Sequence, residues 1–378
     1  MAASIPATHP QSTRARAAIA RSQGAPLTIE EIDVAVPRAD EVLVRLVATG
    51  ICHTDLVCLH GFPVPMPIVL GHEGAGVVEA LGADVKGLAV GDHVLLSFNS
   101  CGACANCADH EPAYCHQFMG RNFAGVRLED GSSPLSQNGS VVHGEFFGQS
   151  SFATFAVSRA VNTVKVDKAL PLATLAPLGC GIQTGAGAVL NALKVKKGRA
   201  IGVFGAGAVG LSAVMAGRIA DAGAIVVVEP NAQRRALALA LGASHAFDPQ
   251  AGDVVAAVKA AIGGLDYAFD TTGIPAVMKS AVDLLLPNGT LGVIGIPPPD
   301  APFPFSIMDI YTRGIGVKCI VEGDSDPHEF IPRLIGFYRE GRLPLEKLIR
   351  EFPFERINDA FAAAADGSVI KPILTFRQ

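Results

Sequence analysis

The sequence predicts an α/β protein with two domains, one built on a doubly wound parallel sheet and the other rich in short β-strands. Three observations lead to this prediction. The chain has 378 residues, more than one ordinary core accommodates. Nearly half of them are hydrophobic, with 41 glycines and no tryptophan, which suits buried parallel strands. Strand and helix patterns alternate through residues 182–321, whereas short strand patterns dominate the residues before them.

The amino-terminal part contains short strand patterns. Residues 41–48 (EVLVRLVA) alternate in hydropathy, which predicts a half-buried strand, and residues 77–80 and 93–98 behave similarly. Glycines and prolines separate these segments, and the Gly/Ser/Asn-rich residues 129–144 predict a surface loop. Residues 1–10 are polar, contain proline and lack an apolar signal core, so we expect a loose tail there.

From residue 200 onward, strands and helices alternate. We expect strands at 200–204, 225–229, 266–270 and 290–295, and helices at 208–222, 231–241 and 275–286, with Asn231 as an N-cap. This alternation indicates a doubly wound parallel sheet. After about residue 322 the pattern returns to helix and short strand, ending with a strand at 373–376. The simplest architecture therefore inserts residues 182–321 into a domain formed by 1–181 and 322–378.

Charge and composition exclude several classes of function. The net charge is −5, from 30 basic and 35 acidic residues, and no basic block stands out, so we expect no nucleic-acid partner. The most apolar stretches, such as residues 200–211, are interrupted by glycine and too short to cross a bilayer, so we expect no membrane partner. A cytoplasmic location is the resulting expectation.

Four of the eight cysteines crowd into fifteen residues, in the pattern Cys101-x2-Cys104-x2-Cys107-x7-Cys115. In a large chain without signs of secretion, clustered thiols favour a metal site over disulfides. This spacing lets four thiolates meet at one tetrahedral zinc ion. Four protein ligands leave no open coordination position, so we expect a structural zinc.

Residues 205–210 (GAGAVG) match the pattern G-x-G-x-x-G. The pattern follows a predicted strand and opens a predicted helix, which is the context of a dinucleotide-binding turn. We expect Gly205 to form the tight turn, Gly207 to let the backbone approach a pyrophosphate, and Gly210 to let the helix pack closely. The helix that begins with Ala208 and Val209 offers backbone N–H groups and a partial positive charge.

Glu229 ends the next predicted strand, nineteen residues after the last glycine of the turn. A carboxylate at this place accepts hydrogen bonds from ribose hydroxyls and repels a 2′-phosphate, which favours NAD over NADP. Arg234 and Arg235 lie close by in the sequence and can offset that repulsion, so the preference for NAD is not absolute.

Cys52, His72 and Cys180 lie in the fragments GICHTD, GHEG and LGCG. Each fragment alone is weak, because a single His or Cys is usually a packed residue. Together they supply two thiolates and one imidazole, a set of three zinc ligands that leaves the fourth position open for catalysis.

With these motifs in this order, the chain resembles the zinc-dependent medium-chain dehydrogenase/reductases over essentially its whole length. More narrowly, it looks like the aryl (benzyl) alcohol dehydrogenases. The segments that carry this resemblance are residues 46–58, 71–79, 146–157, 177–193 and 205–216. The resemblance implies a GroES-like catalytic domain and a Rossmann domain. It also implies reversible, zinc-dependent oxidation of a primary aromatic or allylic alcohol to its aldehyde, with hydride transfer to NAD.

The resemblance assigns roles to residues near the expected zinc ligands. Thr54 would accept a hydrogen bond from the alcohol and start a proton relay, Asp55 would orient the imidazole of His72, and Glu73 would lie behind the metal. From the residues alone, Thr54 could instead be a helix N-cap, with Asp55 in the first turn.

The relay departs from the family pattern at Val57, where better-known relatives have a histidine as the outlet to solvent. His53 is the nearest alternative base, although a contact with the cofactor pyrophosphate would also account for it.

Four further cofactor contacts are implied by the resemblance. Thr184 would pack against the nicotinamide, Ile294 and Ile296 would flank the segment that bonds its carboxamide, and Lys371 would lie near the pyrophosphate. A solvated surface charge is the alternative for Lys371. The remaining cysteines, Cys58 and Cys319, are expected to be small buried hydrophobes.

The expected substrate pocket is apolar, with Phe98, Phe146 and Phe147 as candidates to line it. Benzyl-type alcohols are favoured, and allylic terpenoid alcohols such as geraniol are the nearest alternative. A glutathione-dependent formaldehyde dehydrogenase would need basic pocket residues, and none is obvious. A non-catalytic dinucleotide sensor would have lost zinc ligands that this chain retains. We expect two zinc ions per chain and, from the resemblance, a homodimer or homotetramer.

Overall fold

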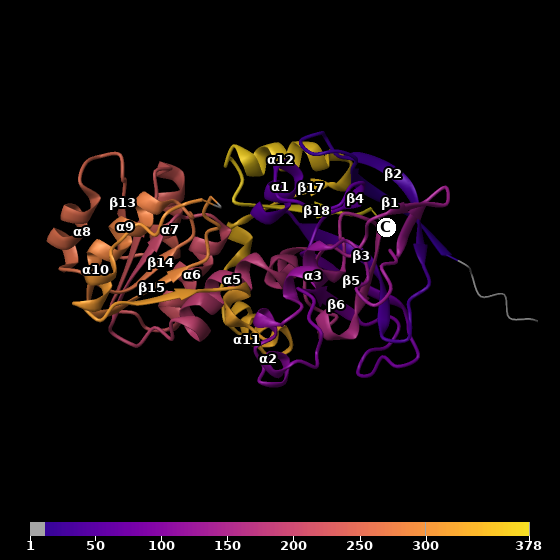
Figure 1. The fold of residues 1–378 in the computed structure, drawn as a ribbon, viewed down its shortest axis with the longest axis horizontal. Coiled ribbons are helices and arrows are strands. Elements are labelled where there is room, and N and C mark those ends of the chain that lie inside the picture. The colour runs from indigo at the N-terminus through magenta and orange to yellow at the C-terminus, as the bar shows by residue number, and fades with distance from the viewer. Residues whose placement is uncertain (1–11, 299, 378) are drawn as a thin grey trace, which may run out of the picture. The chain divides into compact units, whose positions relative to one another are not determined.

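The computed structural model describes residues 12–298 and 300–377, and the described chain divides into two compact units (Figure 1). The first unit comprises residues 12–104, Cys115–Gly179 and residues 349–377. The second comprises Ala105–Tyr114 and Cys180–Leu348. The tail expected at residues 1–10 lies outside the described residues.

The first unit contains two mainly antiparallel sheets, and among its described strands only β17 and β18 pair in parallel. One sheet has the order β4-β1-β2-β7-β8, and the other β10-β6-β5-β3-β18-β17, with β9 also paired to β3. Figure 1 shows the yellow carboxyl-terminal strands β17 and β18 among the indigo amino-terminal elements, because β18 pairs with β3. The strands are β1 (Ser12–Ala20), β2 (Thr28–Ala35), β3 (Glu41–Gly50), β4 (Ile68–Val69), β5 (Gly74–Leu81), β6 (His93–Leu96), β7 (Leu135–Gln137), β8 (Ser140–Val142), β9 (Phe155–Arg159), β10 (Thr163–Val166), β17 (Ile349–Pro353) and β18 (Lys371–Thr375).

Strand β3 is buried along nearly its whole length, rather than on one face as its alternating sequence predicts. The strands β5, β9 and β18 pair with its edges, and helix α4 (Leu172–Leu175) packs against it. The short helices of this unit are α1 (His53–His60), α3 (Phe118–Phe123), α4 (Leu172–Leu175) and α12 (Ile357–Ala365).

The surface loop expected at residues 129–144 contains a hairpin formed by β7 and β8. Its two turn residues, Asn138 and Gly139, both have a left-handed backbone, with φ angles of 49° and 79°. An Asn-Gly pair is the favoured turn for a two-residue hairpin. The strands are only three residues long, too short for alternation in hydropathy to reveal them.

The second unit is built on a six-stranded parallel sheet with the order β13-β12-β11-β14-β15-β16. The order reverses between β11 and β14, and in such sheets the reversal point is where ligands bind. The expected strands and helices are present, with ends that differ by a few residues. The elements are β11 (Ala200–Phe204), β12 (Ala224–Val228), β13 (His245–Phe247), β14 (Leu265–Asp270), β15 (Leu285–Val293), β16 (Gly316–Cys319), α2 (Ala105–Ala108), α5 (Gly181–Gly187), α6 (Ala208–Ile219), α7 (Ala232–Leu241), α8 (Val254–Ile262), α9 (Pro275–Leu284), α10 (Ile307–Tyr311) and α11 (Pro327–Arg339).

The core of this sheet is made of aliphatic and aromatic side chains from successive strands, including Phe204, Val226 and Leu291. Asn231 caps α7 as expected, since its side chain accepts hydrogen bonds from the backbone N–H groups of Gln233 and Arg234.

The chain returns to the first unit at Ile349, later than residue 322, where the change of pattern in the sequence places it. The intervening segment belongs to the second unit because α11 packs against α5, and because Gln183 of α5 bonds to Glu322 and Ser325.

No single helix in residues 12–298 and 300–377 is long and apolar enough to cross a membrane. The bent pair Leu172–Gly179 and Gly181–Ala192 does pass the same test of length and composition.

Candidate active site and zinc centres

Cys52 is the N-cap of helix α1, and Asp55 is the third residue of the helix. The Asp55 Oδ2 atom accepts the backbone N–H of Cys52 at 2.9 Å. The carboxylate thus fixes the loop that carries the thiol, in the manner of a capping box. Thr54 lies inside the helix and is not the N-cap.

Asp55 also orients His72. Its Oδ1 atom lies 3.0 Å from His72 Nδ1 and accepts the backbone N–H of Gly71 at 3.0 Å. Both side chains are fully buried. This contact agrees with the orienting role expected for Asp55, and it leaves Nε2 as the imidazole nitrogen available to a further ligand.

His72 Nε2 is buried and has no hydrogen-bond partner within the described part of the chain. Burial lowers the pKa of His72, but the neighbouring Asp55 more than offsets this, so that the pKa lies well above its ordinary value. The position therefore favours a positive charge, which a bound metal cation supplies as well as a proton does.

The ligand atoms of Cys52, His72 and Cys180 all lie within 4.8 Å of one another, and all three residues are buried. Cys180 directly follows Gly179, whose carbonyl oxygen accepts a hydrogen bond from Ser97 Oγ at 2.7 Å. Two thiols and an imidazole are donors that zinc prefers, and three protein ligands leave one coordination position open. The residues present therefore fit a catalytic zinc ion.

Glu73 and Lys371 form a buried ion pair, and Glu73 directly follows His72 in the sequence. The Lys371 Nζ atom lies 2.8 and 3.0 Å from the two oxygens of Glu73, and 3.1 Å from the carbonyl oxygen of Ile51. Lys371 is only 2% exposed, so it is not the solvated surface charge that the sequence left open. Its ammonium group is engaged by Glu73, and the phosphate contact stays a prediction.

Two phenylalanine rings contact the imidazole of His72, and two further rings pack behind them. The ring of Phe147 stacks on it, with centroids 4.4 Å apart, and Phe146 meets it edge-on at 5.5 Å. Phe123 packs against both phenylalanines, and Phe62 packs against Phe123.

Phe98, the third candidate for lining the substrate pocket, packs on Phe118 with ring centroids 5.8 Å apart, and its place in the pocket stays a prediction. Sequence reasoning missed Phe62 and Phe123, because nothing in the local sequence distinguishes them from ordinary core residues.

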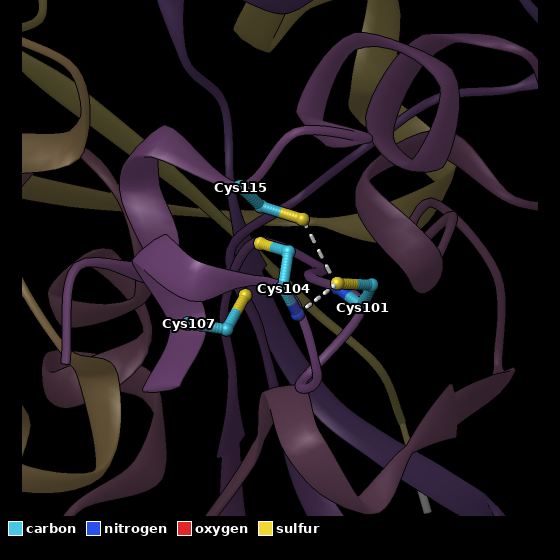
Figure 2. A group of neighbouring side chains, drawn as sticks. All are labelled: Cys101, Cys104, Cys107 and Cys115. Atoms are coloured by element: carbon cyan, nitrogen blue, oxygen red, sulfur yellow. Dashed lines mark hydrogen bonds between the residues drawn. The ribbon is translucent and has the colours of Figure 1, made fainter. Parts of the chain in front are cut away.

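The four thiols of Cys101, Cys104, Cys107 and Cys115 turn toward one another (Figure 2). Their sulfur atoms lie within 4.8 Å of one another, and none forms a disulfide. Burial raises the pKa of the Cys101 thiol, but backbone N–H groups of Ala103 and Cys104 more than offset it, and the pKa is lowered. A thiolate is thereby favoured, as a metal ligand requires. The group fits the structural zinc site expected from the spacing.

The glycine-rich turn has the geometry expected from its pattern. Gly205 has a φ of 93°, and a Cβ atom on it would lie 2.4 Å from Thr271 Oγ1. A Cβ on Gly210 would lie 1.9 Å from the carbonyl oxygen of Gly205, so helix α6 packs too closely for a side chain there. Beside Gly207 there is open space, as an approaching pyrophosphate would need. Helix α6 starts immediately after it, at Ala208 and Val209.

Glu229 is buried and holds the turn in place. Its Oε2 atom accepts the backbone N–H of Ala206 at 2.7 Å, and Oε1 accepts that of Asn231 at 2.9 Å. A carboxylate has about four lone-pair sites, so ribose hydroxyls can still bind. Arg235 pairs with Asp248 at 3.0 Å, while the backbone N–H of Arg234 belongs to the cap of α7.

The remaining cofactor positions lie in the second unit. The Thr184 hydroxyl donates to Glu322 Oε2 at 3.4 Å. The backbone N–H groups of Ile294 and Gly295 both donate to the carbonyl oxygen of Asp270. Ile296 is largely exposed.

The relay residues lie at the start of α1. Thr54 is half-buried, with Oγ1 4.0 Å from Cys52 Sγ, and His53 is exposed.

The two cysteines outside the candidate metal groups, Cys58 and Cys319, differ in burial. Cys58 is buried as expected, whereas the expectation of a buried Cys319 was wrong. Cys319 ends β16, an outermost strand of its sheet, and no described strand covers its outer side.

The comparisons with known proteins agree with these observations. Residues 38–168 match the alcohol dehydrogenase GroES-like domain, and residues 208–338 match the zinc-binding dehydrogenase domain. A geraniol dehydrogenase from Castellaniella defragrans is 52% identical over 364 residues, which are 96% of this chain and 98% of that protein.

Two solved structures are similar over nearly the whole length. An alcohol dehydrogenase zinc-binding domain protein from Burkholderia ambifaria superposes with a TM-score of 0.95 and 49% identity, over 97% of this chain and 100% of that one. A benzyl alcohol dehydrogenase from Acinetobacter calcoaceticus has a TM-score of 0.93 and 43% identity, with the same shares covered. The two domain matches and these full-length similarities establish that the chain belongs to the zinc-dependent medium-chain alcohol dehydrogenases.

Proposed function

We propose that this alcohol dehydrogenase oxidises a primary alcohol conjugated with a ring or a double bond to its aldehyde, with NAD as the hydride acceptor. The observation that carries this proposal is the stacking of Phe147 on His72, a residue of the three-ligand group. This ring supports an apolar, aromatic surface near the group proposed to hold the metal, where an aromatic or allylic substrate would lie.

Cys52, His72 and Cys180 would hold the catalytic zinc ion. When bound there, zinc supplies Lewis acidity toward the alcohol oxygen. Asp55 keeps the imidazole of His72 in the orientation that directs Nε2 to the metal position. The four-cysteine group would hold a second, structural zinc ion, for a total of two per chain.

Thr54 Oγ1 would accept the proton of the alcohol hydroxyl and release its own hydroxyl proton in exchange, since Thr54 is half-buried beside the ligand Cys52. His53, the adjacent residue, is exposed and would pass that proton to solvent in place of the histidine that Val57 replaces. This route keeps the transfer within two neighbouring residues.

The turn at residues 205–210 would bind the pyrophosphate of NAD at the start of α6, and Glu229 would accept the ribose hydroxyls. Thr184, Arg234, Lys371 and the segment Ile294–Ile296 are the further positions proposed to contact the cofactor. Glu229 supports NAD over NADP, because its buried carboxylate would repel a 2′-phosphate.

Benzyl-type and geraniol-type alcohols are the two candidate substrate classes. The ring stacked on His72 favours a flat aromatic substrate, since aromatic pairs gain roughly 0.5–1.5 kcal/mol beyond burial. The relative from Castellaniella favours an allylic terpenoid alcohol, and the relative from Acinetobacter favours a benzylic one. We propose benzyl alcohols as the better substrates, making this an aryl-alcohol dehydrogenase.

The two other functions considered from the sequence have less support. The apolar rings of Phe146 and Phe147 at His72 do not suit the anionic adduct that a glutathione-dependent formaldehyde dehydrogenase oxidises. A non-catalytic sensor would not need the buried group of Cys52, His72 and Cys180.

A homodimer or homotetramer is proposed from the surface of the second unit. Five large apolar side chains that are more than half exposed lie within sixteen residues: Ile296, Phe303, Ile307, Met308 and Tyr311. A monomer rarely leaves so many together in solvent. Strand β16, at the edge of the sheet, lies nearby in the sequence.

Metal analysis and a substrate panel together test the proposal. The wild type is expected to contain two zinc ions and to reduce NAD with benzyl, cinnamyl and geranyl alcohols. The kcat/KM values should be highest for benzyl alcohol and lowest for saturated alcohols, and higher with NAD than with NADP.

Cys180→Ser should remove about one zinc ion and abolish turnover while the four-cysteine zinc stays. Cys58→Ala is the control, because Cys58 is a buried thiol outside both metal groups and should leave the metal content at two. Full activity in Cys180→Ser would contradict the proposed metal site.

A further inference from the structure

Three consecutive residues, Glu322, Gly323 and Asp324, have a left-handed backbone, with φ angles of 48°, 69° and 49°. We call this segment the left-handed turn. A glutamate rarely adopts this conformation, and Glu322 is also buried. Strained residues of this kind persist where the surrounding structure holds them, and they concentrate at functional sites. The contacts of the Glu322 side chain therefore bear on function.

The carboxyl group of Glu322 touches both ends of the first turn of α5. Its Oε1 atom lies 3.7 Å from Cys180 Sγ. Its Oε2 atom accepts hydrogen bonds from Gln183 Nε2 at 3.3 Å and from Thr184 Oγ1 at 3.4 Å. One side chain thus joins a proposed zinc ligand to a proposed nicotinamide contact.

The backbone that presents this carboxyl group is itself fixed. A Cβ atom on Gly187 of α5 would lie 2.3 Å from the carbonyl oxygen of Gly323, so the turn packs directly on the helix backbone. Ser325 Oγ donates to the carbonyl oxygen of Glu322 at 2.5 Å. Asp324 accepts a hydrogen bond from Tyr114 Oη at 2.5 Å. These contacts fix the residues that follow Glu322 and thereby restrict the position of its carboxyl group.

We propose that Glu322 is a positioning residue for the catalytic zinc centre, and this rests on the proposed function. Its carboxyl group accepts a hydrogen bond from the hydroxyl of Thr184 and lies against the sulfur of Cys180, so that it limits the positions this sulfur can take. Groups that contact a metal ligand from behind orient it, and their loss typically costs roughly 10- to 100-fold in metal affinity or activity. The strained backbone is the cost of placing a carboxyl group at this point.

Glu322→Gly separates the positioning role from a role in folding. Glycine adopts a φ of 48° without strain, and this gain should offset much of the stability lost with the hydrogen bonds of the carboxyl group. Zinc release from the catalytic site to the chelator 4-(2-pyridylazo)resorcinol should be roughly 10- to 100-fold faster than in the wild type, with the four-cysteine zinc unaffected. In the cobalt-substituted protein, the thiolate-to-cobalt absorption band should shift, because the sulfur of Cys180 is no longer restrained.

Two further variants keep the test decisive. Asn288→Gly relaxes a left-handed residue of φ 64° outside the metal groups and should release zinc at the wild-type rate. Glu322→Gln keeps the length of the side chain and its hydrogen bonding, and should restore most of the retention. Wild-type release rates and an unshifted cobalt band in Glu322→Gly would overturn the proposal, as would release from Glu322→Gln as fast as from Glu322→Gly. Failure of the proposed function would appear separately, as an absent catalytic zinc or absent turnover in the wild type.

Discussion

Single buried carboxylates organise much of the first unit at the residue scale. Asp55 alone holds the backbone N–H groups of Cys52 and Gly71 and the imidazole of His72. The same contacts therefore stabilise the first turn of α1 and orient the proposed metal ligand His72. Replacing such a residue would disturb the fold and the metal centre together, so neither role can be measured alone.

Glu145 offers a cleaner test of buried charge. Burial raises its pKa from an ordinary value near 4.5 to about 7. The protonated form is thus favoured in the folded state, and its stability contribution is present below pH 4.5 and lost as the pH rises through 7. Glu145→Gln should remove this loss and raise the free energy of unfolding by about 3 kcal/mol above pH 7, with little gain at pH 4. Urea unfolding across this pH range measures the difference.

Glu351→Gln, at an exposed position of β17, is the control for that experiment and should change stability little at any pH. An equal gain from Glu145→Gln at pH 4 and pH 8 would show that its ionisation is not the cause.

Phe147 tests the choice of substrate. Its ring stacks on His72, and leucine would keep apolar bulk without an aromatic face. Phe147→Leu should lower kcat/KM for benzyl alcohol roughly 2- to 10-fold relative to hexanol. Phe98→Leu, which replaces a ring outside this cluster, should leave the ratio of the two substrates unchanged. A constant ratio in Phe147→Leu would mean that this ring does not face the substrate.

The metal-facing residues could be predicted from the sequence because thiols and imidazoles in this number and order seldom occur together except at metal sites. Phe62, Phe123 and Glu322 could not, because their chemistry is common and their role arises only when distant segments meet. Glu322 is 142 residues from Cys180, and no local pattern links the two. The strain of a residue is likewise invisible until its backbone angles are known.

At the scale of elements, the glycine-rich turn combines folding and binding roles in a separable way. A Cβ on Gly210 would collide with the backbone carbonyl of Gly205, whereas one on Gly207 meets open space. Gly210→Ala should therefore lower stability by about 1–3 kcal/mol, although alanine favours helices.

Gly207→Ala should keep the melting temperature and weaken NAD binding roughly tenfold, since its Cβ would occupy the space proposed for the pyrophosphate. Thermal unfolding and NADH fluorescence titration measure the two effects. A stable Gly210→Ala, or a Gly207→Ala with wild-type affinity, would contradict this division of roles.

Four strands of the parallel sheet were predicted because they are long enough to show a continuous apolar pattern, whereas β13 and β16, with three and four residues, were not predicted. The first unit was harder to predict. The hairpin of β7 and β8 has only three residues in each strand, and β3 is buried along nearly its whole length, in part by helix α4, which is distant in sequence. In both cases contacts with other segments, rather than the local residues, decide the structure.

For the whole molecule, the point at which the chain returns to the first unit depends on contacts that sequence patterns do not show. Residues 322–348 resemble the start of the closing segment, yet they belong with the parallel sheet. Their side chains bond to α5 and hold it, and they include the left-handed turn. A change in pattern marks a change of local structure, which need not coincide with a boundary between units.

The apolar residues exposed between Ile296 and Tyr311 predict self-association of the whole molecule. Ile307 and Tyr311 are more than three-quarters exposed and lie one turn apart on α10, so they share one face of the helix. The double variant Ile307→Asp/Tyr311→Asp should shift the mass measured by light scattering from a dimer or tetramer to a smaller species at micromolar concentration, because buried unpaired carboxylates are costly. Val90→Asp changes an exposed apolar residue of the first unit and should leave the mass unchanged. A wild-type monomer, or an unchanged mass in the double variant, would show that this surface serves another purpose.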